Sequence, residues 1–471
     1  MHHALTISEI IHEIFTHLLE PHNAPRHHSA GYLTLAALAV TCRTFREPAL
    51  ALRWRQLWSI RPLVPLFPRD IWDESDLYDP NDFDLDIVRL PSQEEWIRFE
   101  SYASRICDIH IGFEGFTGVI NFMVMLSMKY ANPSLESHHL FPNLRTLSWN
   151  SQEKTALSFA HLFFPPSLRC LTLGFGGLDD RSAPVLLLLL QHQWPRLKQF
   201  NISGVFCTRN MLESHAFQQL ETLDCEEIDE SALGYLAKLT TLKDLSFYLP
   251  DPIPTNVAFD EGFVNLQTLS LTADEISVAI SFLMSTHIYL LRDWDVTWPQ
   301  EGTVDIAALR PLFSFSGLRY LHIDGICSFD LSDDSLAELA DAWPRLEELM
   351  LNHCSGWGRT SEITFKGLKS LIQACPLLQD LALAIDATQL NVVSSTTPGE
   401  DIHNDKIETL NLGNSIIGSP AAVALVLGEL FWSLKEVQVY VDPQRELYGH
   451  LWSEVNSYLL TRQANIQDIG L

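Results

Sequence analysis

The segments "SGLRYLHI" (residues 316–323) and "PRLEELML" (residues 344–351) share the frame L-x-x-L-x-L, with apolar residues at positions one, four and six. Ten other segments fit the frame, some with another apolar residue in place of leucine. The first and last repeats start 290 residues apart, which gives a period of about 26 residues. The repeats begin at Leu144, Leu168, Leu197, Leu220, Leu242, Leu266, Leu291, Leu318, Leu346, Leu378, Ile407 and Leu434.

Repeats of this frame and length resemble the leucine-rich-repeat family, over roughly four-fifths of the chain. The resemblance implies an α/β solenoid, with a curved parallel sheet lined by helices. The segment "ICDIHI" (residues 106–111) is a candidate for an earlier repeat, so we assign residues 105–471 to this domain. Cys225 lies at an inward strand position that such repeats normally fill with leucine, and Cys354 and Cys375 occupy places where cysteine-containing repeats bury a thiol. Buried cysteine of this kind behaves as a small apolar residue.

A second pattern precedes the repeats, in "LTISEIIHEIFTHL" (residues 5–18) and "LTLAALAVTCRTFREPALALRWRQLWSI" (residues 33–60). Its apolar residues recur at helical spacing. The joined pattern resembles the F-box of fungal F-box proteins with leucine-rich repeats. Two departures are the Ile7-Ser8 pair in place of the usual proline and a histidine-rich insertion at residues 20–32, which we interpret as a loop or, alternatively, a metal site.

The F-box resemblance implies docking onto a Skp-type linker protein, and through it onto a cullin–RING ubiquitin ligase. We assign residues 1–60 to the F-box and residues 61–104 to a linker that contains prolines and a run of acidic residues. The residues that the resemblance assigns to linker-protein binding are Ile7, Ile10, Ile14, Phe15, Leu18, Leu35, Leu38, Val40, Phe45 and Trp54.

Residue spacing in the sequence does not fit a metalloprotease site or a nucleotide-binding loop. His12 and His17 are five residues apart, so on a helix they diverge by about 140° and cannot share a metal ion as the histidines of H-E-x-x-H do. The glycine-rich "LTLGFGGLDD" (residues 171–180) has Asp179 where a nucleotide-binding loop needs its third glycine. We therefore expect no catalytic residues, no metal and no cofactor.

The formal charge of −28 argues against binding to nucleic acid or to anionic membranes, because phosphate groups are bound by clustered Lys and Arg. The sequence has no apolar run long enough to span a bilayer and no signal-peptide pattern, and its eight cysteines contain no C-x-x-C pair. We expect a cytoplasmic or nuclear protein that is monomeric outside its complex.

The alternation of side chains along a strand places the third, fifth and seventh frame positions on the face opposite the core. None of these positions in the twelve repeats is Lys or Arg, and several are acidic. We therefore predict a basic protein substrate, with two tyrosines as anchors. The predicted substrate-binding residues are Asp224, Glu226, Asp244, Tyr248, Asp293, Asp295, Tyr320, Asp324 and Glu348.

Together these observations predict a non-catalytic, substrate-recognition adaptor of an SCF-type ubiquitin ligase. The alternative is a leucine-rich-repeat scaffold for protein interactions, in which the N-terminal helices only cap the solenoid.

Overall fold

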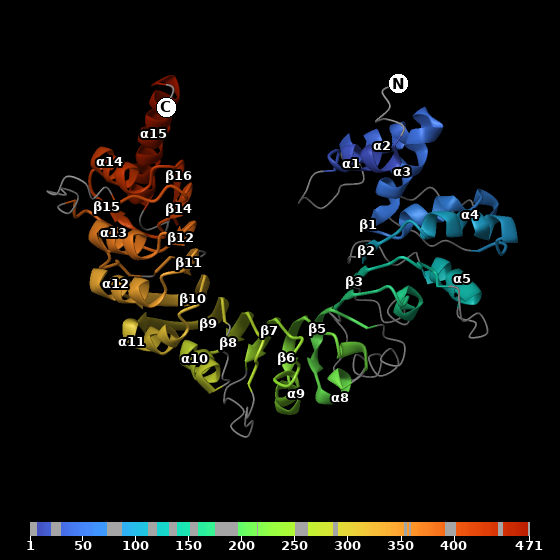
Figure 1. Ribbon diagram of the computed structural model, residues 1–471, viewed down its shortest axis with the longest axis horizontal. Helices are drawn as coiled ribbons and strands as arrows, with labels where there is room; N and C mark the ends of the chain where they lie inside the picture. The colour runs from blue at the N-terminus through green and yellow to red at the C-terminus, as the bar shows by residue number, and fades with distance from the viewer. Residues whose placement is uncertain are drawn as a thin grey trace. The chain divides into compact units, whose positions relative to one another are not determined.

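A computed structural model describes residues 7–19, 30–72, 87–111, 120–130, 139–150, 159–174, 196–213, 215–249, 262–285, 291–352, 356–357, 359–390, 402–440 and 446–469. The protein is α/β, with a parallel sheet of 14 strands that is not closed into a barrel (Figure 1). The strands follow one another across this sheet in sequence order. The chain divides into two compact units, unit 1 (Met1–Glu226) and unit 2 (Glu227–Leu471).

Unit 1 begins with three helices and continues with strands that alternate with helical connections (Figure 1). Its elements are α1 (Ser8–Thr16), α2 (Ala30–Thr41), α3 (Arg43–Arg55), β1 (Gln56–Leu57), η2 (Arg61–Leu66), η3 (Arg69–Ile71), α4 (Gln93–Ala103), β2 (Asp108–Ile111), α5 (Ile120–Tyr130), β3 (Thr146–Asn150), η5 (Ala160–Phe163), β4 (Cys170–Gly174), β5 (Gln199–Cys207), α8 (Arg209–Leu212), η7 (His215–Phe217) and β6 (Thr222–Ile228), which runs across the unit boundary.

Unit 2 repeats the strand and helix pattern and adds a two-stranded sheet of β13 and β15. Its elements are α9 (Glu230–Leu236), β7 (Asp244–Leu249), β8 (Thr268–Ala273), α10 (Ile276–Ser285), β9 (Asp293–Asp305), α11 (Ile306–Leu309), η8 (Arg310–Ser314), β10 (Tyr320–Asp330), α12 (Asp333–Ala342), β11 (Glu348–Leu351), α13 (Phe365–Ala374), β12 (Asp380–Ala382), β13 (Asp386–Ala387), β14 (Thr409–Asn411), β15 (Ile416–Ile417), α14 (Pro420–Leu430), β16 (Glu436–Gln438) and α15 (Glu446–Ile469).

The leucine frame sets where each strand begins. Every predicted repeat, including the one at Ile106, yields a strand of the large sheet that starts at its third position. Burial alternates along the strands, so in β7 the residues Leu245, Phe247 and Leu249 are buried while those between them are partly exposed. The fourth and sixth positions therefore face the core, as the alternation predicts.

Hydrogen bonds join each repeat to the next. The carbonyl of Arg145, at the second frame position, accepts the N–H groups of Arg169 and Cys170 at 2.9 and 3.0 Å. The side chain just before the frame also reaches back, as when Asn143 Nδ2 donates to the Ser104 carbonyl at 2.7 Å. Asn265 Nδ2 donates to the Thr240 carbonyl in the same way. Polar side chains therefore hold the register between repeats.

The N-terminal helices have a small core of their own. Ile11, Phe15, Leu35, Ala49 and Leu52 are buried together, and the ring of Phe15 meets that of Phe45 edge-on, with centroids 5.4 Å apart. This core fixes which faces of α1 and α2 remain outside it.

The described parts of residues 61–104 are packed structure, in contrast to their interpretation as a linker. Phe67, Trp72, Trp96 and Phe99 are buried, and the ring of Phe67 stacks on that of Phe99 at 5.2 Å. These aromatic residues add apolar area to the core of unit 1, which a solvated linker would not do. The acidic run at residues 73–86 lies outside the described residues.

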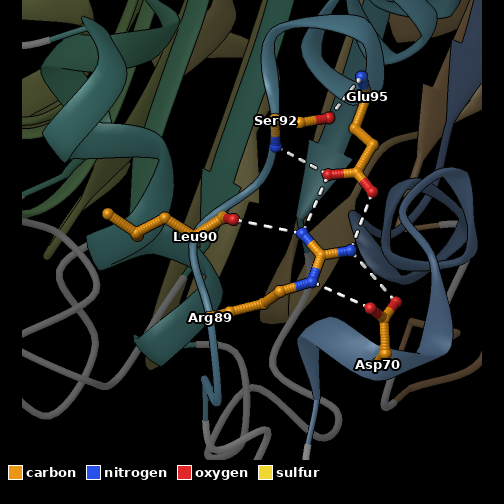
Figure 2. A network of polar contacts seen from close by, with 5 residues as sticks. All are labelled: Asp70, Arg89, Leu90, Ser92 and Glu95. Carbon is orange, nitrogen blue, oxygen red and sulfur yellow. Dashed lines mark hydrogen bonds and ion pairs between the residues drawn. The ribbon is translucent and has the colours of Figure 1, made fainter.

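A polar network fixes the chain on both sides of that acidic run (Figure 2). Arg89 forms two hydrogen bonds to Asp70, at 2.8 and 3.1 Å, and two to Glu95, at 3.0 and 2.8 Å. Ser92 caps α4 and accepts from the Glu95 N–H, while the Ser92 N–H donates to Glu95 at 2.6 Å. Hydrogen bonds from Arg89 and from the Ser92 backbone lower the pKa of Glu95 to about 2.

Helix α15 covers the last strand of the sheet in unit 2. Asn456 Oδ1 accepts the N–H of Val437 at 2.8 Å, and Asn456 Nδ2 donates to the carbonyl of the same residue at 2.9 Å. One side chain thus makes the two bonds that a further strand would make to β16. Such coverage blocks pairing of the edge with another chain.

Candidate functional site

Helix α1 carries an apolar stripe that the core of unit 1 leaves uncovered. Ile7, Ile10 and Ile14 are 37%, 39% and 47% exposed. They lie three and four residues apart, at the N-cap and on α1, so they share one side of the helix, next to the side that buries Ile11 and Phe15. We call these three residues the α1 stripe.

The other residues assigned to linker-protein binding divide into four groups. Val40 on α2 is 86% exposed, whereas Phe15 and Leu35 lie inside the helical core. Leu18, Leu38 and Phe45 pack partly against that core. The Trp54 ring contacts Tyr102 of α4, with centroids 4.9 Å apart. The stripe and Val40 are therefore the members of the set most open to a partner.

The strand register of unit 2 aligns the third frame positions of neighbouring repeats. The strand pairing places Asp293 opposite Tyr320, Tyr320 opposite Glu348, and Glu348 opposite Asp380. The third frame positions thus form a row across the sheet, which we call the third-position row. Its members in unit 2 are Asp244, Thr268, Asp293, Tyr320, Glu348, Asp380, Thr409 and Glu436.

A second row lies two residues further along each strand, where Asp295 is opposite His322. His322 Nε2 lies 3.1 Å from Glu348 Oε2. Tyr248, on the same face, donates its hydroxyl hydrogen to Asp274 at 2.7 Å. The face therefore combines carboxylates with aromatic rings, and several of its polar groups are already hydrogen-bonded.

Basic residues of the repeats concentrate at the second frame position, where they form ion pairs. Lys198 pairs with Glu221 at 2.6 Å, and Lys435 pairs with Glu408 at 2.6 Å. Each pair joins the second positions of two adjacent repeats. These positive charges are therefore engaged at the entry to the strands.

Arg319, Tyr320 and Glu347 form a further cluster at the start of β10 and β11. Arg319 Nη2 lies 2.5 Å from Glu347 Oε1, and the Tyr320 hydroxyl donates to Glu347 Oε2 at 2.9 Å. Burial disfavours ionisation of Glu347, but the hydrogen bonds from Arg319 and Tyr320 outweigh it and lower the pKa of this carboxyl. The hydrogen bond to Glu347 raises the pKa of Tyr320. This tyrosine is held in place and remains a phenol at neutral pH.

Asp224 and Glu226 belong to unit 1, where both make internal bonds. Asn201 Nδ2 donates to Asp224 Oδ2 at 2.5 Å, and the Gly204 N–H donates to Glu226 Oε2 at 2.8 Å.

The same sheet face holds a pair of rings that sequence analysis missed. Trp58 stacks on His110 with centroids 4.3 Å apart, and burial lowers the pKa of His110. Trp58 lies outside the leucine frame, so no periodic signal marks it.

Of the three cysteines named in the sequence analysis, two are buried and one lies outside the described residues. Cys225 and Cys375 are buried, and burial raises the pKa of Cys375 to about 12. Cys354 lies outside the described residues, as does most of the histidine-rich insertion.

In the described part of the chain, no group of three or more His, Cys, Asp or Glu residues could hold a metal ion. None of the helices within these ranges is long and apolar enough to cross a membrane.

Comparison with known proteins gives little further guidance. No protein-family model matches the chain, and no curated protein matches it. Among solved structures, the chain is similar to one from the crystal structure of the Rad7 and Elc1 complex in yeast, with 16% sequence identity and a TM-score of 0.38. The similarity covers 69% of this chain and 83% of that chain.

Proposed function

We propose that the protein is a substrate-recognition adaptor of an SCF-type, cullin–RING ubiquitin ligase. In this proposal residues 1–60 form an F-box that docks onto a Skp-type linker protein, and the repeats form a leucine-rich-repeat solenoid that holds the protein to be ubiquitylated. The observation that carries the proposal is the α1 stripe, because α1 already has a core on its other face and still exposes three isoleucines. An exposed apolar stripe of this kind is typical of a surface that a partner covers.

The protein would contribute proximity and no bond-making chemistry. Holding a substrate lysine near a charged ubiquitin carrier replaces a bimolecular encounter by a high effective concentration. The sheet face is the surface that would hold the substrate, and its carboxylates favour a basic segment.

The linker-protein interface is tested with Ile14→Asp. Its side chain is 47% exposed, so the chain should stay folded, whereas an unpaired carboxylate buried in an apolar interface costs several kcal/mol. We expect the variant to lose binding to a purified Skp-type protein in a pull-down and in calorimetry.

The matched control is Leu425→Asp on α14, because Leu425 is 70% exposed and lies far along the chain from α1. It should bind the linker protein as the wild type does. Wild-type protein that fails to bind, or an Ile14→Asp variant that binds normally, would show that the F-box assignment is wrong.

The substrate face is tested with the double variant Asp293→Asn, Asp295→Asn, both on β9. We expect the variant to capture less basic protein than the wild type at low salt. Raising the salt to about 0.15 M should reduce capture less in the variant than in the wild type, because fewer carboxylates remain whose attraction salt can screen. Capture is measured by mass spectrometry of proteins retained from a cell extract. The same capture and the same salt dependence in variant and wild type would exclude the acidic face as the recognition surface.

A scaffold without a ligase is the second candidate, and one set of contacts favours it. Arg105 forms an ion pair with Glu47 of α3 at 2.8 Å, and the Cys107 N–H donates to the Arg55 carbonyl at 2.8 Å. Together with Trp54 and Tyr102, these contacts join α3 to the start of the sheet, as a cap would. A scaffold predicts that deleting residues 1–60 destabilises the repeats, with no linker protein recovered from either form.

A further inference from the structure

Basic residues precede the strands of unit 1 in a row across the sheet. Arg145, Arg169 and Lys198 hold the second frame positions directly before β3, β4 and β5, and Arg55 takes the same place before β1. Cys107 holds the place before β2. From Cys107 to Lys198, the N–H of each of these residues donates to the carbonyl of the one before the preceding strand, at 2.7–2.9 Å. We call the four cations the basic row.

Cations at second frame positions elsewhere pair with a glutamate of an adjacent repeat. Lys435 pairs in this way with Glu408 in unit 2. Lys198, at the end of the basic row, pairs with Glu221. The charges of these two lysines are therefore partly neutralised within the chain.

Arg145 and Arg169, in the middle of the basic row, have no glutamate beside them in the row. The neighbours of Arg145 are Cys107 and Arg169, and those of Arg169 are Arg145 and Lys198. Neither arginine forms an ion pair with another residue that the structure describes. Like charges on adjacent strands repel one another, so the middle of the row is a positive surface that lacks counter-charges in a chain of charge −28.

Both arginines keep hydrogen-bond donors available. Arg145 is exposed. Arg169 is half-buried, and its Nη1 donates to the carbonyls of Pro166 and Leu168 at 2.7 Å, which fixes the guanidinium. Within the described ranges, its Nε and Nη2 form no hydrogen bond. A guanidinium held through one nitrogen can still bind a carboxylate through the other two.

The strands behind these arginines are free of acidic residues. None occurs in β3, β4 or β5, whose third frame positions are Thr146, Cys170 and Gln199. The acidic residue on β2 is Asp108, which lies 3.9 Å from Arg55 Nε at one end of the row. No carboxylate of β3, β4 or β5 therefore competes with one from a partner.

We propose that the basic row binds an acidic segment of a protein partner, in which several carboxylates follow one another along an extended chain. The row runs from β1 to β5, so it is about 19 Å long at about 4.8 Å per strand, and an extended chain of about six residues covers that length. Arginine suits this partner because it binds a carboxylate through two parallel hydrogen bonds.

Two observations favour this occupant over other anions. The cations are placed before separate strands across the sheet, which suits a series of carboxylates better than a single phosphate. The charge of −28 repels a long polyanion, which disfavours nucleic acid. The inference goes beyond the proposed function, because it concerns a different surface and a partner segment of the opposite charge.

The test uses the purified full-length chain and short fluorescent peptides in which glycine alternates with glutamate or with glutamine. Glutamine has nearly the shape of glutamate and lacks its charge. We expect the glutamate peptide to bind, and the glutamine peptide to bind at least about tenfold more weakly, measured by fluorescence anisotropy at about 0.05 M salt. Binding of the glutamate peptide should weaken as the salt concentration rises.

The double variant Arg145→Gln, Arg169→Gln locates the binding surface. It should weaken binding of the glutamate peptide about tenfold, because it removes the two charges that lack a counter-charge. The single variant Arg145→Gln changes an exposed side chain, so the chain should stay folded, and it should weaken binding about threefold.

The matched control is Lys435→Gln, which removes a cation from the same frame position in unit 2, where the side chain is 56% exposed and paired with Glu408. It changes the net charge as Arg145→Gln does and should leave binding unchanged. Equal binding of the two peptides, unchanged binding by the double variant, or an equal loss in Arg145→Gln and Lys435→Gln would overturn the proposal.

Two further ligands separate the proposed occupant from other anions. A glutamine peptide with one phosphoserine at its centre that binds as tightly as the glutamate peptide would show a phosphate site instead. A single-stranded oligothymidine that binds more tightly than the glutamate peptide would show a nucleic-acid surface instead. Weaker binding of both supports the acidic segment. None of these measurements involves the linker protein, so failure here is distinct from failure of the adaptor function.

Discussion

Single polar side chains hold the repeats together, and Asn404 in unit 2 is the clearest case. It is 4% exposed, its Nδ2 donates to the Leu378 carbonyl at 2.8 Å, and its Oδ1 accepts the N–H groups of Lys406 and Ile407 at 2.9 Å. Leucine frames do not mark such a residue, because its role depends on a carbonyl in the preceding repeat.

Asn404→Ala should lower the free energy of unfolding by about 2–4 kcal/mol, because it leaves buried N–H and carbonyl groups without partners. The measurement is urea denaturation followed by tryptophan fluorescence. Asn265→Ala is the comparison, since this exposed residue donates one bond, to the Thr240 carbonyl, and should cost about 1 kcal/mol or less. Equal losses in the two variants would contradict this account.

The Arg89 network predicts a local dependence on pH. Its hydrogen bonds lower the pKa of Glu95 from 4.5 to about 2, so the native state favours the ionised form. The stabilisation is fully present above about pH 4.5 and is lost as the pH falls toward 2. The protection of amide hydrogens at residues 87–96, which is the observed exchange rate relative to the intrinsic rate at the same pH, should therefore fall over this range in the wild type. In Glu95→Gln this protection should already be lower at neutral pH and should change less between pH 4.5 and 2.

At the scale of elements, α12 and α13 are joined by one carboxylate. Asp333, in the first turn of α12, accepts the N–H groups of Thr364 and Gly367 at 2.7 and 3.0 Å and the Thr364 hydroxyl at 2.7 Å. A Cβ at position 367 would lie 2.5 Å from the Asp333 carboxylate oxygen. The glycine is therefore required by a close approach between neighbouring repeats.

Gly367→Ala should thus destabilise the protein, by about 1–3 kcal/mol, although alanine is the better helix former. The double variant Asp333→Ala, Gly367→Ala should lose less than the sum of the two single losses, because the clash disappears with the carboxylate. Thermal and urea denaturation measure both effects. A stabilising Gly367→Ala would show that the close approach does not constrain this position.

Asn456 on α15 gives a second test at this scale. Asn456→Leu removes both bonds to Val437 and leaves the edge of β16 open, so we expect concentration-dependent self-association through that edge, measured by light scattering. Ser457→Ala changes a neighbouring exposed residue and should stay in the wild-type state of association.

The leucine frame predicted correctly which strand residues face the core, because burial of alternate residues is a local pattern in the sequence. It did not predict that β9 and β10 extend to Asp305 and Asp330, since pairing between two strands depends on residues outside the frame. It also did not predict the packing of Phe67 and Trp96, because aromatic clusters form between segments with no shared period. The roles assigned to the α1 stripe and the acidic face remain predictions.

At the scale of the whole molecule, the charge of −28 sets the response to salt. Like charges repel one another more in the compact state, and added salt screens this repulsion. We expect the midpoint of thermal unfolding to rise as potassium chloride increases from about 0.01 to 0.15 M. The ion pairs described above are mostly exposed and should oppose this trend only weakly, because exposed pairs contribute little. A midpoint that falls with salt would mean that these pairs outweigh the net repulsion.

The order of the strands in the sheet bears on how the protein is made. Within the large sheet, neighbouring strands follow one another in sequence order, so a strand leaving the ribosome meets an edge formed by the strand of that sheet made before it. Chains generally fold from the N-terminus during synthesis. Because α15 follows β16 in the sequence, the edge of β16 stays uncovered until α15 has been made, and during that interval it is open to pairing with another chain.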